Sequence, residues 1–221
     1  MSINSDKSKQ TTSQIVRYTL EDQTPNQPLT RLRNHLSQFI SISDDEWEMI
    51  SESFTVQNFD KDVSLLGSGQ TCRSMFYVSS GITRSYVIDE NGRDFTTCFH
   101  FNKPSSNVKN LFLTDFSSVI RKEASQLHFQ TLTEVSAVEL PTSAISGLYD
   151  RGSKWEKLGR RLAEEAYYHT QKRAMSLLMK TAKQRYIELC EQMPHLVDSI
   201  PEYYVASYLG ITPQSLSRIK S

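Results

Sequence analysis

Three polar side chains in the last ten residues have the types and the spacing that read DNA. Gln214, Ser217 and Arg218 are three and four residues apart, so a helix would place them on one face. A guanidinium can donate two hydrogen bonds to guanine, an amide pairs with adenine, and hydroxyls contact phosphates as well. This set therefore predicts a helix that contacts base edges in the major groove.

The preceding residues predict the two short helices that must position this face. Val205 and Leu209 lie on one side of a first helix, and Gly210 ends it, because glycine adopts the left-handed conformation at low cost. Thr212 can cap the first amides of a second helix, in which Pro213 takes the first position. The spacing predicts a helix-turn-helix. The alternative is a helical hairpin that merely ends a globular domain, with its polar face in solvent.

The segment VASYLGITPQSLSRI, residues 205–219, resembles the helix-turn-helix of the Crp/Fnr family of bacterial transcriptional regulators. The resemblance implies that 212–218 is the recognition helix and that Arg218 reads a base. Pro213 stands where many members have another arginine, and Gln214 stands where they have a glutamate, so we expect a different target sequence. The predicted DNA-contacting residues are Thr212, Gln214, Ser215, Ser217, Arg218 and Lys220.

Upstream of this segment, apolar residues recur at every second position, which is the period of β-strands. Many short strands separated by turn residues are typical of a small barrel or roll. The segment FYVSSGITRSYVIDENGR, residues 76–93, resembles the double-stranded β-helix of cyclic-nucleotide-binding domains. Two helices are expected before the strands, the second one beginning at a capping box of Ser43 and Glu46. The predicted strands cover 55–59, 63–66, 75–78, 82–88, 95–101 and a further set within 127–140.

These elements predict an α+β fold with three folded parts. A jelly-roll-like sensor domain comes first, a long dimerisation helix follows, and an all-α helix-turn-helix domain ends the chain. The expected parts are a disordered or extended tail at 1–28, a cyclic-nucleotide-binding-like β-roll domain at 29–150, a dimerisation helix at 151–179 and a helix-turn-helix domain at 180–221.

The resemblance to cyclic-nucleotide-binding domains fails at the residues that hold the phosphate. Members that bind cyclic nucleotides use a short helix containing Gly-Glu and, further along, an arginine beside Ser or Thr. The segment 102–125 has no glycine, and Ser117-Ser118 stands where the arginine is expected. We therefore predict that the chain does not bind cyclic AMP through the family's usual contacts. Lys109 and Arg121 are either substitutes or surface charges.

A long helix is predicted from about Gly152 to Leu178. Its stripe of apolar and small residues keeps a four-residue step, so it winds around the helix and can face the β domain in one part and a partner helix in another. The alternative is an amphipathic helix that lies on its own domain. The resemblance implies a dimer helix, with Thr170 and Gln171 near the family's effector-contacting Thr-Ser pair. The stripe consists of Leu158, Leu162, Ala166, Thr170, Ala174 and Leu177.

Composition excludes several classes of protein. The chain has 25 Lys and Arg against 25 Asp and Glu, but basic residues outnumber acidic ones over 154–185, which suits DNA and equally suits a solvated helix. The 3 cysteines and 5 histidines show no ligand spacing, so we expect no zinc, haem, iron–sulfur cluster or other cofactor. No apolar run approaches the ~20 residues of a membrane helix, and the first ten residues lack the apolar core of a signal peptide, so we expect a cytoplasmic protein.

These features predict a sequence-specific transcriptional regulator of the Crp/Fnr type, in which a homodimer reads an inverted repeat. The expected partners are double-stranded DNA, a second copy of the chain, RNA polymerase and an unidentified small-molecule effector. The alternative is a ligand-binding or protein-interaction module with a vestigial DNA-binding head, because no wing follows Ser221 and Pro213 replaces a contact. An enzyme is disfavoured, because no catalytic constellation or phosphate-binding glycine loop is present.

Overall fold

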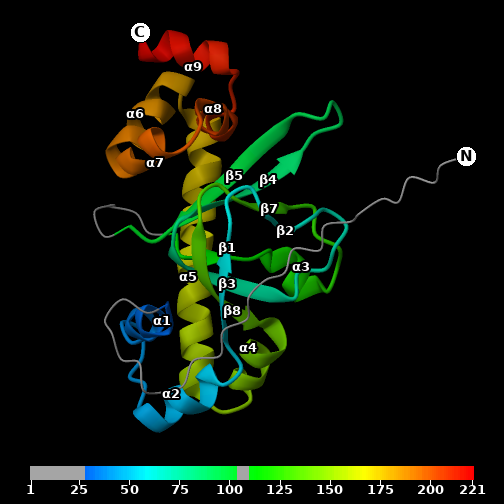
Figure 1. Cartoon of the computed structure of the whole chain (residues 1–221), viewed down its shortest axis with the longest axis vertical. Coiled ribbons are helices and arrows are strands. Elements are labelled where there is room, and N and C mark those ends of the chain that lie inside the picture. The colour runs from blue at the N-terminus through cyan, green and yellow to red at the C-terminus, as the bar shows by residue number, and fades with distance from the viewer. Residues whose placement is uncertain (1–27, 104–109) are drawn as a thin grey trace, which may run out of the picture.

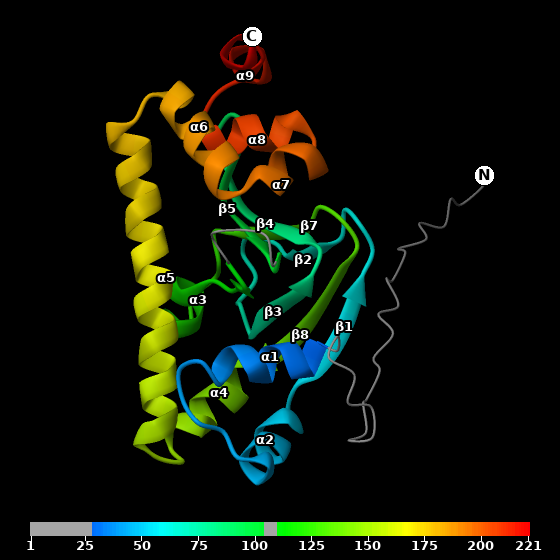
Figure 2. The same cartoon turned by 90° about the vertical axis from the view of Figure 1, so that its left-hand side faces the viewer.

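The computed structural model describes residues 28–103 and 110–221. They form a β-roll, a long helix α5 (Ser153–Met179) and a head of short helices between 182 and 220. Helix α5 runs beside the whole roll and connects it to the head, which lies at the opposite end from the first two helices (Figures 1 and 2). Lys109 and residues 1–27 of the predicted tail lie outside the described residues, and Pro28 already begins a helix.

The roll consists of two antiparallel sheets, each of four described strands, with the orders β1-β8-β3-β6 and β2-β7-β4-β5. The prediction of a small roll is confirmed, and the strands 55–59 and 82–88 have the predicted bounds. Strand β6 was missed, because two residues are too few to show an alternating pattern. The strands are β1 Thr55–Phe59, β2 Ser64–Leu66, β3 Ser74–Ser80, β4 Ile82–Ile88, β5 Asp94–Phe101, β6 Phe112–Leu113, β7 His128–Thr131 and β8 Val135–Pro141.

Two helices, α1 (Pro28–Leu36) and α2 (Asp44–Ser51), cover one end of the roll. The predicted capping box of α2 is confirmed: the Glu46 amide donates to Ser43 Oγ at 3.2 Å, and the Ser43 amide donates to Glu46 Oε2 at 2.8 Å. Lys154 Nζ also lies 2.6 Å from the Glu46 carboxylate, so α2 is tied to the first turn of α5. The hydrogen bond from Lys154 and the one from Ser43 lower the pKa of Glu46.

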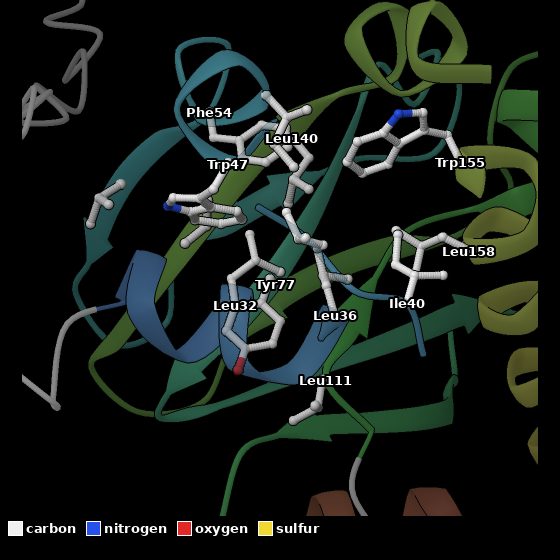
Figure 3. Packing of buried hydrophobic residues seen from close by; sticks show 14 residues of the cluster. Leu32, Leu36, Ile40, Trp47, Phe54, Tyr77, Leu111, Leu140, Trp155 and Leu158 are labelled. Atoms are coloured by element: carbon white, nitrogen blue, oxygen red, sulfur yellow. The ribbon is translucent and has the colours of Figure 1, made fainter. Parts of the chain in front are cut away.

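The main core lies between these helices, the roll and the start of α5. Leu32 of α1, Trp47 of α2, Tyr77 of β3 and Trp155 of α5 meet there, and each is at most 9% exposed (Figure 3). Burial of a side chain of this size contributes about 1.5–3 kcal/mol. The first turns of α5 therefore belong to the core of the roll.

The predicted stripe on α5 divides between two environments. Leu158 is buried against the roll, whereas Thr170 and Ala174 are exposed. The half-buried members are Leu162, Ala166 and Leu177. The stripe thus leaves the roll as it winds around the helix. With 27 residues α5 is a long helix, but no helix within 28–103 and 110–221 is both long and apolar enough to cross a membrane.

The head contains α6 (Ala182–Gln192), α7 (Pro194–Ser199), α8 (Glu202–Leu209) and α9 (Pro213–Lys220). Its first helix begins at a second capping box, formed by Thr181 and Gln184. The Gln184 amide donates to Thr181 Oγ1 at 3.3 Å, and the Thr181 amide donates to Gln184 Oε1 at 2.9 Å.

Candidate nucleic-acid interface

Helix α8 ends at Gly210 in the way that its sequence predicts. Gly210 has φ 69° and ψ 35°, which is the left-handed conformation. Its amide donates to the Ser207 carbonyl at 3.1 Å, and the Ile211 amide donates to the Ala206 carbonyl at 3.0 Å. These two bonds form a Schellman motif, which satisfies the last carbonyls of the helix and turns the chain sharply.

Helix α9 starts immediately after this turn. The Ser215 amide donates to Thr212 Oγ1 at 3.2 Å, and Pro213 takes a first-turn position, where its missing N–H costs nothing. The Thr212 and Ser215 hydroxyls lie 3.0 Å apart. Two residues predicted to contact DNA thus also hold the start of the recognition helix.

The two helices pack through small and branched apolar residues. Val205, Ala206 and Leu209 of α8 and Leu216 of α9 are each at most 1% exposed. Ala206 has no room for a larger side chain, because it is fully buried where these residues meet. Helices α6 and α7 complete this core with Leu189, Leu196 and Ile200.

The outer face of α9 presents the predicted reading residues to solvent. Gln214, Ser217 and Arg218 are exposed, and α9 forms the tip of the head (Figure 1). Within the described part of the chain, Arg218 takes part in no ion pair. Its guanidinium, the Gln214 amide and the Ser217 hydroxyl are therefore available to bases or phosphates.

Lys220 and Ser215 differ from these three residues. Lys220 pairs with the Glu202 carboxylate at the start of α8, and the hydrogen bond from this pair raises the pKa of Lys220. Ser215 is half-buried. Of the six predicted contacts, Gln214, Ser217 and Arg218 form the open reading face, while the others also have partners within the head.

The opposite side of α8 is fixed to strand β5, which lies at the edge of its sheet. Ser207 Oγ accepts a hydrogen bond from the Thr96 amide at 2.8 Å and donates to Asp94 Oδ1 at 2.9 Å. Ser207 is 8% exposed and Thr96 is fully buried. The serine thus satisfies the free edge of β5 and joins the head to the roll. Sequence analysis missed this role, although a serine beside apolar α8 residues was a signal.

Two arginines fix the same helix through its tyrosines. The Arg84 guanidinium lies 4.2 Å from the ring centroid of Tyr204, and it forms an ion pair with Asp94 at 2.9 Å. The Arg173 guanidinium of α5 lies 3.7 Å from the ring centroid of Tyr208, one helical turn further along α8. Contacts of this kind contribute about 2 kcal/mol when they are desolvated. The roll, α5 and the head are therefore held together by the buried Arg84 and the half-buried Arg173.

The segment that lacks the family's phosphate-binding residues contains a short helix, α3 (Phe116–Arg121), in which the amides of Ser117 and Ser118 are already occupied. Asp115 Oδ1 accepts hydrogen bonds from the amides of Ser117 at 2.9 Å and Ser118 at 3.2 Å, and Asp115 Oδ2 accepts from Ser125 Oγ at 2.6 Å. Asp115 is 6% exposed. A buried carboxylate therefore stands where an anionic ligand of this helix would need donors.

The candidate ligand-binding residues do not meet in one site. Ser118 is buried and donates to the Glu123 carbonyl at 2.5 Å, whereas Ser117 and Arg121 are exposed on α3. Thr170 and Gln171 are exposed on α5. Neither of these α5 residues lines the described cavities between α5 and the roll, whose walls include Leu162, Ala166, His169, Lys172 and Arg173.

The chain is similar to several solved structures, although its sequence matches no protein-family model and no curated protein. FixK2 from Bradyrhizobium japonicum is 19% identical, with a TM-score of 0.63, over 76% of this chain and 82% of that one. A protein from Eubacterium rectale described as a Crp/Fnr transcriptional regulator is 14% identical, with a TM-score of 0.66, over 84% and 85%.

A third similar structure is the c-di-GMP responsive global regulator CLP from Xanthomonas campestris, which is 12% identical, with a TM-score of 0.58, over 78% of this chain and 87% of that one. At such identities the likeness concerns the fold. It covers about three quarters or more of this chain in each of the three structures. The chain therefore has the Crp/Fnr fold, in which a cyclic-nucleotide-binding-like roll is joined by a long helix to a helix-turn-helix head.

Proposed function

We propose that this protein is a sequence-specific DNA-binding transcriptional regulator. The observation that carries the proposal is the exposed face of Gln214, Ser217 and Arg218 on a helix that follows a Schellman turn. Helix-turn-helix proteins use this face of the second helix to contact base edges. Two of the similar structures are described as regulators, one as a transcriptional regulator of the Crp/Fnr family and one as a global regulator.

The regulator acts as a homodimer through the outer face of α5. Thr170, Ala174 and Leu178 fall on one side of the helix at intervals of four residues, and Leu178 is 81% exposed. Small residues at 170 and 174 permit the close approach of a second helix, and burial of Leu178 would favour it. A two-fold dimer then carries two recognition helices about 34 Å apart and reads an inverted repeat.

The protein does not bind cyclic AMP as an effector through the contacts that the resemblance implies. The phosphate would meet the buried Asp115 carboxylate, which already accepts the first amides of α3. Two neighbouring anions repel each other, and the amides of Ser117 and Ser118 are already occupied. The proposed partners also include RNA polymerase and a small-molecule effector whose chemistry differs from that of cyclic AMP.

Selection of bound sequences from a random DNA pool tests the proposal. The wild-type protein is expected to enrich an inverted repeat whose half-sites lie one helical turn apart. Ala174→Glu, which places charges in the α5 contact, is expected to lose the two-fold repeat while the head stays folded. If the wild-type protein enriches no motif, the proposal is wrong, and a ligand-binding or protein-interaction module with a vestigial head becomes the better reading.

A further inference from the structure

A small cavity lies where the roll, α5 and the head meet. Its volume is about 90 Å³, and a water molecule needs roughly 10–15 Å³ on this measure, so it has room for a ligand of a few heavy atoms. Cys98 and Phe99 of β5 form one wall, Lys172 and Arg173 of α5 form another, and Arg185 of α6 belongs to the head.

The cavity carries an excess of positive charge. Lys172, Arg173 and Arg185 line it, and Glu188 is the one carboxylate among its described walls. Glu188 is already engaged, because it accepts hydrogen bonds from Ser176 at 3.1 Å, Lys180 at 2.8 Å and Gln192 at 3.2 Å. The hydrogen bonds from Lys180 and Ser176 lower the pKa of Glu188 despite the opposing effect of its burial. The three lining cations therefore exceed the one lining carboxylate by two charges.

Arg173 has a donor that nothing in the described part of the chain satisfies. One terminal nitrogen donates to the Tyr208 carbonyl, but Nε is buried and has no hydrogen-bond partner. A buried donor left unpaired is unfavourable, and a ligand oxygen would remove that cost. Burial also lowers the pKa of Arg173, and the opposing effects of Tyr208, Cys98 and Glu188 do not cancel it.

Arg185 is placed differently. It donates to the Leu209 carbonyl at 2.8 Å, which fixes its guanidinium at the head side of the cavity. An anion in the cavity would therefore be in contact with α5 and close to a fixed charge of the head. Its binding would favour the conformation in which the head is docked on the roll, since only that conformation assembles all the walls.

We propose that this cavity binds a small oxyanion, either a carboxylate or an inorganic oxyanion, with Arg173 Nε–H and the Lys172 ammonium as its ligands. Oxyanions suit a guanidinium in geometry and charge, and the volume limits the ligand to a few heavy atoms. The site is separate from the α3 segment that Asp115 caps. The claim that the oxyanion acts as the effector rests on the proposed function. The claim that the cavity binds an oxyanion does not.

The test measures thermal unfolding of the full chain with sodium acetate, nitrate or phosphate, each replacing sodium chloride at constant ionic strength. At least one of the three is expected to raise the Tm of the wild-type protein saturably. Arg173→Lys, which retains the charge but lacks Nε–H, and Lys172→Gln are each expected to weaken the fitted affinity at least tenfold. Lys183→Gln, an exposed charge change on α6, is the matched control and should leave the affinity unchanged.

Two results would overturn the inference. One is a wild-type Tm that responds to all three anions as it responds to chloride. The other is an equal response in Arg173→Lys, Lys172→Gln and Lys183→Gln, which would indicate general salt screening. Because no DNA is present, these outcomes are independent of the random-pool selection. A failed selection with intact anion binding would contradict the regulator, while the reverse pattern would contradict only the oxyanion site.

Discussion

The hydroxyl of Ser207 lies 2.8 Å from the backbone nitrogen of Thr96, so a side chain of the first helix of the helix-turn-helix caps the edge strand of the roll. Edge strands leave unpaired amides and carbonyls, which proteins cover or pair. Here the cover is the helix-turn-helix head itself. The orientation of the recognition helix is therefore coupled to the position of β5.

Ser207→Ala should destabilise this junction. The substitution leaves the fully buried Thr96 amide without a partner, and a lost buried hydrogen bond costs about 1–3 kcal/mol. Urea unfolding should show a lower free energy of unfolding for Ser207→Ala. The same change at the exposed Ser217 should alter it by less than about 0.5 kcal/mol. Equal stabilities of the two variants would mean that the head is not docked through Ser207.

Gly210→Ala should also destabilise the protein, because φ 69° is unfavourable for alanine and the added Cβ would lie 3.3 Å from Phe95. The expected cost is about 1 kcal/mol or more. Gly147→Ala is a matched control in helix α4 (Thr142–Tyr149), where no atom lies within 4 Å of the added Cβ. It should stabilise by about 0.5–1 kcal/mol. Thermal unfolding measures the stability of both variants relative to the wild-type protein. A Gly210→Ala variant that is more stable than the wild-type protein would contradict the left-handed conformation of Gly210.

Ala174→Glu should convert the dimer into a monomer. The carboxylates would face each other across the α5 pair, where both desolvation and repulsion oppose association. Sedimentation velocity should give the mass of one chain for Ala174→Glu and of two chains for the wild-type protein. Ser143→Glu adds the same charge on an exposed position of α4 and should remain dimeric. A dimeric Ala174→Glu would place the association on another surface.

Acid should destabilise the roll through His100. Burial lowers the pKa of this histidine from 6.5 to about 4, so the unfolded chain binds a proton at a higher pH than the folded chain. Its contribution is therefore complete above about pH 6.5 and is lost as the pH falls toward 4, at up to about 1.4 kcal/mol per pH unit. His169 and His195 have pKa values lowered by burial as well and act in the same direction.

The free energy of unfolding, measured in urea between pH 7 and pH 5, checks the assignment. His100→Gln removes one titrating group, so its stability should fall less steeply than that of the wild-type protein over this range. Parallel curves for the two proteins would mean that His100 is not responsible.

The parts of the fold that follow local rules could be predicted from the sequence. Gly210 and Thr212 specify the turn through their own backbone conformations, and the Ser43 and Thr181 capping boxes join residues only three positions apart. Helix α4 was missed, because Gly147 and two serines reduce its helix propensity and packing against the roll decides its conformation.

The docking of the head could not be predicted in the same way. Ser207 and Thr96 are 111 residues apart, and a serine in a short helix gives no indication of its distant partner. Arg173 belongs to a basic stretch that reads as solvated, yet it stacks on Tyr208. Asp115 is a typical N-cap residue, but the six residues of α3 that follow it are too few to show a helical period.

The most direct test of the regulator is the affinity of Arg218→Ala for the DNA sequence that the wild-type protein selects, compared with a scrambled sequence of equal length at two salt concentrations. Arg121→Ala, an exposed arginine on α3, is the matched control. Loss of one bidentate base contact costs about 1–3 kcal/mol, so Arg218→Ala should bind the selected site about 5- to 150-fold more weakly while the control binds normally. An equal, salt-sensitive loss on both sequences would contradict base reading, because it would mean that Arg218 contacts only phosphates.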